Sequence, residues 1–128
     1  MSDIKTYSFN EDTQVLDLRT ERVLKVDDII SHYVHISSDN SLPRKMRVLI
    51  DSRGTKMDLR IEDIALTNEA VKKALTKYTF LKEAIIVDKP YETVIATMFE
   101  RFYAKMDSYA FRVFSTENAA RSWLMMNF

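Results

Sequence analysis

The four consecutive apolar residues from Ala84 to Val87 constrain the fold of this chain more than any other feature. A strand with one face in water alternates apolar and polar residues, and this run does not alternate. It therefore predicts a central strand that helices cover on both faces. A second compact run of apolar and branched residues, from Met46 to Ile50, predicts another buried strand, which ends at Asp51.

Helical periodicity separates the predicted strands. Apolar residues recur at three- and four-residue steps from Val26 to Val34 and, more strongly, from Tyr91 to Met106. A weaker helical pattern over residues 60–78 fits either one broken helix or two short ones, with Asp58 as a candidate N-cap. The remaining segments predict an N-terminal hairpin (residues 4–9 and 15–18), a short strand (109–114) and a last helix (115–126).

The order of these elements predicts the fold class. Strands that alternate with helices form parallel pairs, because each helix returns the chain to the same edge of the sheet. The opening hairpin adds one antiparallel pair. We therefore expect an α/β fold, a single domain over residues 1–128 with a mixed β-sheet and helices on its faces.

The composition excludes several classes of site. The chain has no cysteine, so thiolate nucleophiles, disulfides and thiolate zinc sites are excluded. Gly54 is the one glycine, so the glycine-rich phosphate loops and the nucleophile elbow are excluded as well. With no oxyanion loop and no recognisable pair of catalytic carboxylates, we expect a protein that is not an enzyme and binds no cofactor.

Charge and hydropathy bear on partners and compartment. The formal net charge is zero, which argues against nucleic acid as a partner. The longest apolar runs have four residues, far below the ~20 that span a bilayer, so we expect no membrane insertion. Met1 to Lys5 lack the basic start and apolar stretch of a signal peptide, and we expect a cytoplasmic protein.

Two features of the sequence resemble a known family. Val48 to Asp51 form a strand that ends in Asp, and the segment from Phe114 to Leu124 reads F-S-T-E-N-A-A-R-S-W-L. Together with the element order, these features resemble the SpoIIAA-like group of the STAS superfamily, named for sulfate transporters and anti-sigma-factor antagonists. The resemblance implies a mixed sheet flanked by helices and a non-enzymatic binding or regulatory role.

The resemblance also implies a functional surface on the loop after Asp51 and at the start of the next helix. Phosphorylated members of the family carry Ser or Thr at that helix start, in a pattern like D-S-S-G. Here the helix start reads Met57 to Arg60 and has no hydroxyl, so we expect the phosphoswitch to be absent or displaced. Ser52 lies at the end of the strand instead and is a poor candidate.

The same segment is locally basic. Residues 42–60 contain six basic side chains and two acidic ones, a local excess of four positive charges in a neutral protein. A helix that began near Asp58 would add unpaired backbone N–H groups and a partial positive charge. We therefore predict contact with an acidic protein surface or an anionic group, although a solvated charged face is the alternative. The predicted partner-binding residues are Asp51, Arg53, Gly54, Lys56, Asp58 and Arg60.

A histidine pair offers a third candidate site. His32 and His35 are three residues apart, and Asp28 precedes His32 by one turn. Such a set can share a metal ion. A helical projection places all three opposite the apolar stripe, so we expect them to face water and to bind no metal.

The helix from Tyr91 to Met106 has a wide apolar surface, which is either core or the lining of a site. In the second interpretation its outer residues, with Leu124 and Phe128, line a pocket for a lipid-like ligand or the seam of a homodimer. The candidate residues are Tyr91, Met98, Phe99, Phe102, Tyr103 and Met106. The sequence thus supports two functions: a module that binds a protein partner after Asp51, or a carrier or sensor of a small apolar or anionic ligand.

Overall fold

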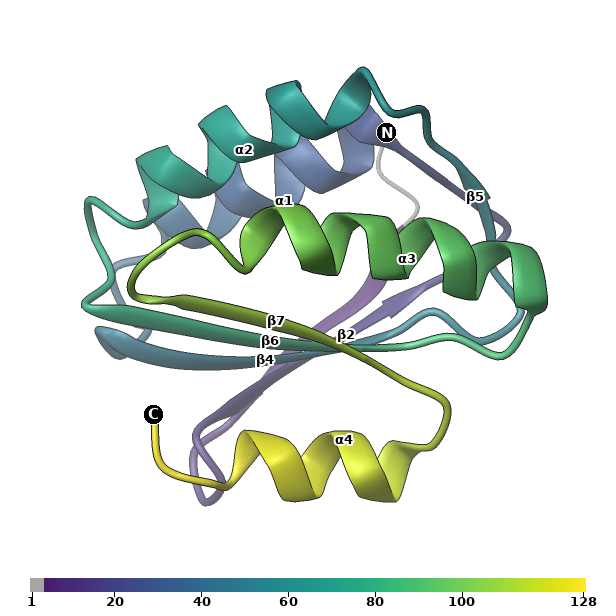
Figure 1. Cartoon of the computed structure of the whole chain (residues 1–128). Helices are drawn as coiled ribbons and strands as arrows, with labels where there is room; N and C mark the ends of the chain where they lie inside the picture. Colours follow the sequence, from purple (N-terminus) through teal and green to yellow (C-terminus); the bar gives the residue numbers. More distant parts are fainter. Residues whose placement is uncertain (1–3) are drawn as a thin grey trace.

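The computed structural model describes residues 4–128, which form seven strands and four helices (Figure 1). The longest helix has 14 residues, and none among the described residues is long and apolar enough to cross a membrane. The strands are β1 (Ile4–Asn10), β2 (Val15–Thr20), β3 (Val23–Lys25), β4 (Lys45–Asp51), β5 (Lys56–Asp58), β6 (Phe80–Ile86) and β7 (Tyr109–Phe114). The helices are α1 (Val26–Ser38), α2 (Asp63–Ala74), α3 (Pro90–Tyr103) and α4 (Glu117–Leu124).

The main sheet has five strands in the order β1-β2-β4-β6-β7. β1 and β2 form the predicted antiparallel hairpin, and all other neighbours in this sheet are parallel. β6 lies between β4 and β7, with Glu83 opposite Val48 on one side and Phe111 on the other. The predicted mixed α/β sheet is confirmed.

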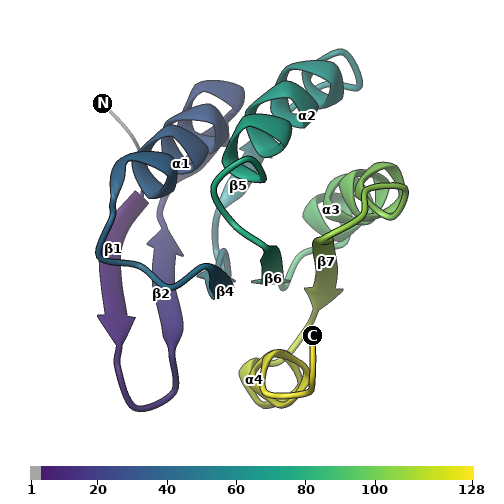
Figure 2. The ribbon, with the colours of Figure 1, turned by 90° about the vertical axis from the view of Figure 1, so that its left-hand side faces the viewer.

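Helices cover both faces of this sheet. α1, α2 and α3 lie on one face and α4 lies on the other (Figure 2). Ile85 and Val87 belong to the core under α1–α3, whereas Ala84 and Ile86 pack with Ala120 of α4. The predicted strand at Ala84–Val87 is therefore covered on both faces, and this is why its apolar residues do not alternate.

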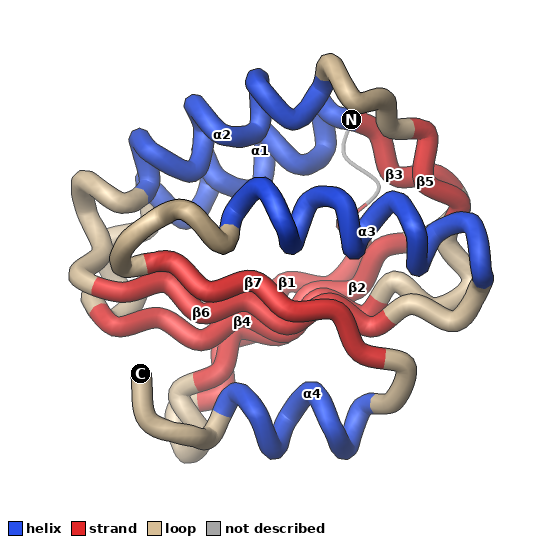
Figure 3. The backbone as a smooth tube through the Cα atoms, viewed as in Figure 1, coloured by secondary structure: helices blue, strands red, loops and turns tan. Residues whose placement is uncertain are grey.

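A second sheet was not predicted. β3 and β5 pair in parallel at one end of the molecule, visible beside α1 and α2 in Figure 3. Asp58 is the last residue of β5 and not a helix cap. One unbroken helix follows, which begins at Asp63, and its N-cap is Glu62. The helix start predicted near Arg60 is therefore wrong.

The solvent-facing side of α1 also differs from the prediction. Asp28 and His32 are buried, whereas Val34 is 59% exposed. The predicted apolar stripe stopped at Val34 and left out Ile36, which is fully buried. Including Ile36 rotates the core face of the helix toward His32. Of the three residues expected to face water, His35 alone is exposed.

Candidate functional site

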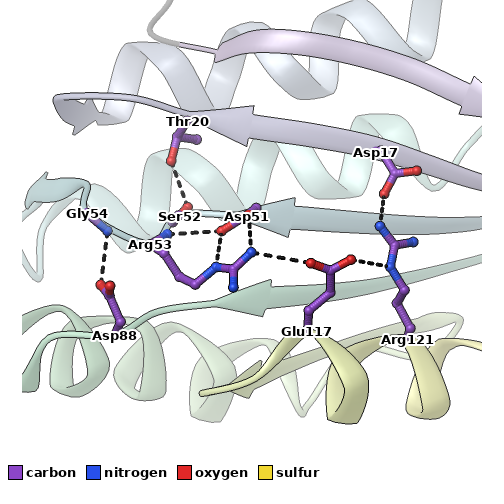
Figure 4. Close-up of polar contacts among 9 residues, drawn as sticks. All are labelled: Asp17, Thr20, Asp51, Ser52, Arg53, Gly54, Asp88, Glu117 and Arg121. Atoms are coloured by element: carbon purple, nitrogen blue, oxygen red, sulfur yellow. Dashed lines mark hydrogen bonds and ion pairs between the residues drawn. The ribbon is translucent and has the colours of Figure 1, made fainter.

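The loop after β4 is held by hydrogen bonds to two carboxylates (Figure 4). Asp51 accepts three from Arg53, one from its backbone N–H and two from its guanidinium. Asp88 accepts one from the backbone N–H of Gly54 at 2.9 Å. Gly54 has a φ of +81°, a conformation that favours glycine. Three predicted residues, Asp51, Arg53 and Gly54, thus form one ordered turn.

The positive charge of Arg53 is compensated. Its guanidinium contacts Asp51 at 2.7 Å and Glu117 at 3.3 Å. Glu117 also accepts a hydrogen bond from Arg121, and Arg121 forms an ion pair with Asp17 of β2. The ion pairs therefore form a chain that ends at Asp17 (Figure 4). The hydrogen bond from Arg53 holds the pKa of Asp51 below its usual value. Arg53 is therefore less available to an acidic partner than its sequence context suggested.

The other predicted partner-binding residues lie on β5 and just after it. Lys56, Asp58 and Arg60 are exposed, while Met57 and Leu59 between them are buried. The backbone N–H of Arg60 donates to Asp63, so these residues precede the helix and do not form its N-terminus. The anion site expected at a helix start is not formed, and the exposed cations remain as a predicted protein-binding surface.

Hydroxyl groups are buried beneath this loop. Thr20 donates to Ser52, and its hydroxyl also lies 2.8 Å from that of Thr55. All three residues are at most 2% exposed. Ser52 is therefore not presented at the surface.

The predicted residues of the long helix separate into two groups. Phe99 and Tyr103 are buried and face the sheet, whereas Tyr91 and Phe102 are exposed. Met98 is half-buried on α3, and Met106 is half-buried beyond its end. The expected contribution of the last helix to the same surface is wrong, because Leu124 packs on the opposite face of the sheet. The homodimer seam stays a prediction.

Phe99 and Tyr103 line a cavity between the sheet, α1, α3 and the β3–β5 pair. Its volume is about 50 Å³. A single buried water needs roughly 10–15 Å³ and a benzene molecule occupies a cavity of about 150 Å³, so this space suits an apolar molecule smaller than benzene. The lining residues are Leu18, Thr20, Leu24, Ile29, His32, Tyr33, Ile50, Met57, Leu59, Ile85, Ala96, Phe99, Tyr103 and Phe111.

Four of these lining side chains are polar, and three of them have their hydroxyl hydrogen-bonded to other residues. Thr20 bonds Ser52, Tyr33 donates to Glu83, and Tyr103 donates to Thr67. The fourth is His32, whose Nδ1 is buried and has no hydrogen-bond partner in residues 4–128. The cavity is thus lined mainly by apolar side chains, and His32 is a lining residue that carries an unpaired ring nitrogen.

The other nitrogen of His32 belongs to a buried cluster around Glu83. Nε2 lies 2.9 Å from Oε2 of Glu83, and the hydroxyls of Tyr33 and Tyr109 donate to Oε1 at 2.5 and 2.6 Å. Burial alone would raise the pKa of Glu83, but hydrogen bonds from His32, Tyr109 and Tyr33 bring that pKa below its usual value. Burial raises the pKa of both tyrosines.

The sequence contains a signal for this buried cluster that helical periodicity does not detect. Glu83 directly precedes the run from Ala84 to Val87, and strand alternation places it on the same face as Ile85 and Val87. A carboxylate on the covered face of a central strand requires buried donors. His32 lies 2.9 Å from Glu83 as such a donor, and the projection of α1 had placed it in water.

Comparison with known proteins supports the fold. A solved structure of an uncharacterised DUF3478-family protein from Shewanella loihica PV-4, described as having a SpoIIAA-like fold, matches with a TM-score of 0.58. The match covers 97% of this chain and 95% of that protein at 16% identity. No family model and no curated sequence matches. The chain therefore has a SpoIIAA-like fold, as the sequence resemblance implied.

Proposed function

We propose that this protein, which has a SpoIIAA-like fold, is a non-catalytic carrier or sensor that binds a small, mainly apolar molecule in the cavity beneath α3. The observation that carries the proposal is the cavity itself, apolar in its lining and bordered by a buried histidine with an unpaired nitrogen. Small-molecule sites are typically apolar pockets with a few polar groups in their lining. A water molecule fits less well, because buried waters make 2–4 hydrogen bonds.

The arrangement of reactive groups supports binding over catalysis. The buried imidazole and carboxylate face each other through Nε2 of His32 and Oε2 of Glu83. The hydroxyl of Thr20, the one aliphatic alcohol in the lining, is engaged with Ser52 and Thr55. Acyl transfer requires a nucleophile beside a free base, and these lining residues do not provide such a pair.

Methyl NMR under xenon pressure tests the proposal, because a xenon atom is apolar and smaller than benzene. We expect the methyl resonances of Ala96 and Ile85, which line the cavity, to shift on addition of xenon. Those of Ala120 and Ile86, in the core against α4, serve as internal controls and should not move. The melting temperature should rise with ligand concentration, because the ligand binds the folded state. Unchanged Ala96 and Ile85 resonances at high xenon pressure contradict the proposal.

Protein binding through the edge after Asp51 is a second candidate function. The exposed cations Lys56 and Arg60 favour it, since both follow the ordered turn after β4 in the chain. Affinity capture should retain a partner that a Lys56→Glu, Arg60→Glu variant loses. A Lys72→Glu, Lys105→Glu variant makes the same change of charge at exposed sites elsewhere and should retain it. Equal retention by both variants contradicts this function.

A further inference from the structure

A groove runs between α1 and α2, which lie side by side over the sheet (Figure 2). Its volume is about 280 Å³. Two of its lining side chains are apolar and exposed, Val34 of α1 at 59% and Leu66 of α2 at 54%. An amphipathic helix needs one apolar stripe, and the stripe of α2 is already buried in the core through Ile64 and Val71. The fold of one chain therefore leaves Leu66 uncovered.

The α2 side of this groove has the geometry of a coiled-coil hole. Four of its lining residues follow the spacing i, i+3, i+4 and i+7: Leu66, Glu69, Ala70 and Lys73. In knobs-into-holes packing, four residues of one helix surround a single side chain from the facing helix. The small side chain of Ala70 leaves room for a larger knob. α2 itself carries such a knob, the exposed Leu66.

A two-fold axis fits this knob and this hole together twice. The axis makes the two α2 helices antiparallel and seats each Leu66 in the hole of the other copy. Lys73 lies about one helical turn beyond the centre of the hole, and Glu62 and Asp63 lie about one turn before Leu66. Lys73 of each copy therefore meets Glu62 and Asp63 of the other copy.

The charges of α2 agree with that register. Glu62 and Lys73 are exposed, and Asp63 is half-buried. Lys72 instead lies 3.8 Å from Glu69 of its own helix. Acids at the start of a helix and bases at its end also suit the helix dipole, so the charges alone do not indicate a partner. Their match to the register set by the knob favours a second copy over an unrelated helix.

We propose that the groove between α1 and α2 binds the same groove of a second copy of this chain, in a two-fold dimer with antiparallel α2 helices. Leu66 of each copy packs against Ala70 and Val34 of the other copy. This dimer is independent of the ligand site beneath α3, and it differs from the seam that the sequence predicted on α3. One pair of helices buries less surface than a standard interface, so we expect a weak dimer with a Kd on the order of 100 µM.

Sedimentation equilibrium with matched variants tests the dimer. We expect the wild type to pass from monomer to dimer between about 10 µM and about 1 mM. Leu66→Lys removes the knob and places a charge in an apolar contact, so it should weaken dimerisation at least about tenfold. Phe102→Lys makes a comparable change on α3, where Phe102 is 47% exposed, and should leave the Kd within about twofold.

A charge exchange tests the antiparallel register. Lys73→Glu and Glu62→Lys each place like charges opposite one another at both ends of the interface. Each single variant should weaken the dimer roughly fivefold, because exposed ion pairs contribute modestly. The double variant Glu62→Lys, Lys73→Glu restores opposite charges and should recover most of the wild-type affinity. A double variant as weak as the single ones would overturn the antiparallel register.

Methyl NMR of the wild type tests the same surface without any substitution. The resonances of Val34 and Leu66 should shift as the protein concentration rises, and those of Val94, which is equally exposed on α3, should not. A protein that stays monomeric at about 1 mM overturns the proposal. A dimer that Phe102→Lys dissociates and Leu66→Lys does not would place the seam on α3 and overturn it as well.

Discussion

Glu83 is a carboxylate kept ionised inside the core. Three donors surround it, His32 from α1, Tyr33 from the same helix and Tyr109 from β7. A buried ion of this kind adds little net stability when it is fully paired, but removal of one partner is expensive. The cluster therefore fixes the position of α1 over β6 and β7, and it orients the imidazole of His32, a residue that lines the cavity.

Removing a tyrosine hydroxyl measures the strength of this cluster. Tyr109→Phe removes a donor to a buried carboxylate and should lower the free energy of unfolding by about 1.5–3 kcal/mol. Tyr103→Phe removes a bond to the neutral hydroxyl of Thr67 and should cost about 0.5–1.5 kcal/mol. Both tyrosines are buried, so the same substitution is compared in both places. Urea unfolding gives both values, and a smaller loss for Tyr109→Phe contradicts the ionised cluster.

The pH dependence of stability should carry the signature of Glu83. Its pKa in the folded state is lower than the ~4.3 expected when the chain is unfolded. The contribution of Glu83 to stability is therefore fully present above about pH 4.3 and is lost as the pH falls through the folded-state pKa. A ¹³C NMR titration of the Glu83 carboxyl carbon should give a midpoint below about 4.3. A midpoint above that value would mean that burial outweighs the three donors.

At the scale of elements, segments with a clear apolar pattern were predictable and very short or rotated ones were not. The covered strand at Ala84–Val87 was recognised from its unbroken apolar run, and the helix from Tyr91 from a pattern that repeats over several turns. β3 and β5 have three residues each, too few for a period, and β5 is defined by its pairing with β3. For the same reason the sequence placed a helix start where β5 ends.

The candidate site was predictable in part for a related reason. Phe99 and Tyr103 lie on the apolar face of a strongly periodic helix and were identified from it. His32 was assigned to water because the helical projection placed it opposite an apolar stripe that stopped at Val34 and left out Ile36. Its buried partner, Glu83, is 51 residues away in the chain. Such a pairing depends on the order of strands and helices in space, which periodicity does not provide.

A pair of substitutions on α1 tests which face of the helix packs on the core. Ile36→Ala should destabilise the protein by about 2–5 kcal/mol, because Ile36 is fully buried. Val34→Ala should change stability by about 0.5 kcal/mol or less, because Val34 is 59% exposed. Urea unfolding of both variants gives the comparison. The apolar stripe inferred from the sequence instead predicts that Val34 is buried and that Val34→Ala is destabilising. Equal losses of stability in the two variants would therefore support that stripe.

At the scale of the whole molecule, the two faces of the sheet are packed differently. The face under α4 is filled by a small cluster that includes Leu49, Ile86 and Leu124. The face under α1 and α3 contains the cavity. An unfilled apolar cavity of about 50 Å³ lowers stability by roughly 1 kcal/mol. Its position beside His32, whose Nδ1 has no hydrogen-bond partner among the described residues, is the reason to interpret that loss as the consequence of a binding site.

One substitution made on both faces tests this asymmetry. Ala96 of α3 lines the cavity and Ala120 of α4 packs in the filled cluster, and both are buried helical alanines. Replacing either by Val carries the same intrinsic helix penalty, which cancels in the comparison. At Ala96 the added methyl groups enter free space, whereas at Ala120 they overpack a filled core.

We therefore expect Ala96→Val to be more stable than Ala120→Val by about 1–3 kcal/mol. Because the new methyl groups occupy ligand space, Ala96→Val should also weaken xenon binding by at least about tenfold, while Ala120→Val leaves that affinity unchanged. Thermal melting and NMR titration of the two variants give both comparisons. Equal destabilisation would show that side chains fill the cavity in solution. Unchanged xenon affinity in Ala96→Val would place the ligand elsewhere, since a xenon atom bound beneath α3 cannot avoid the enlarged side chain.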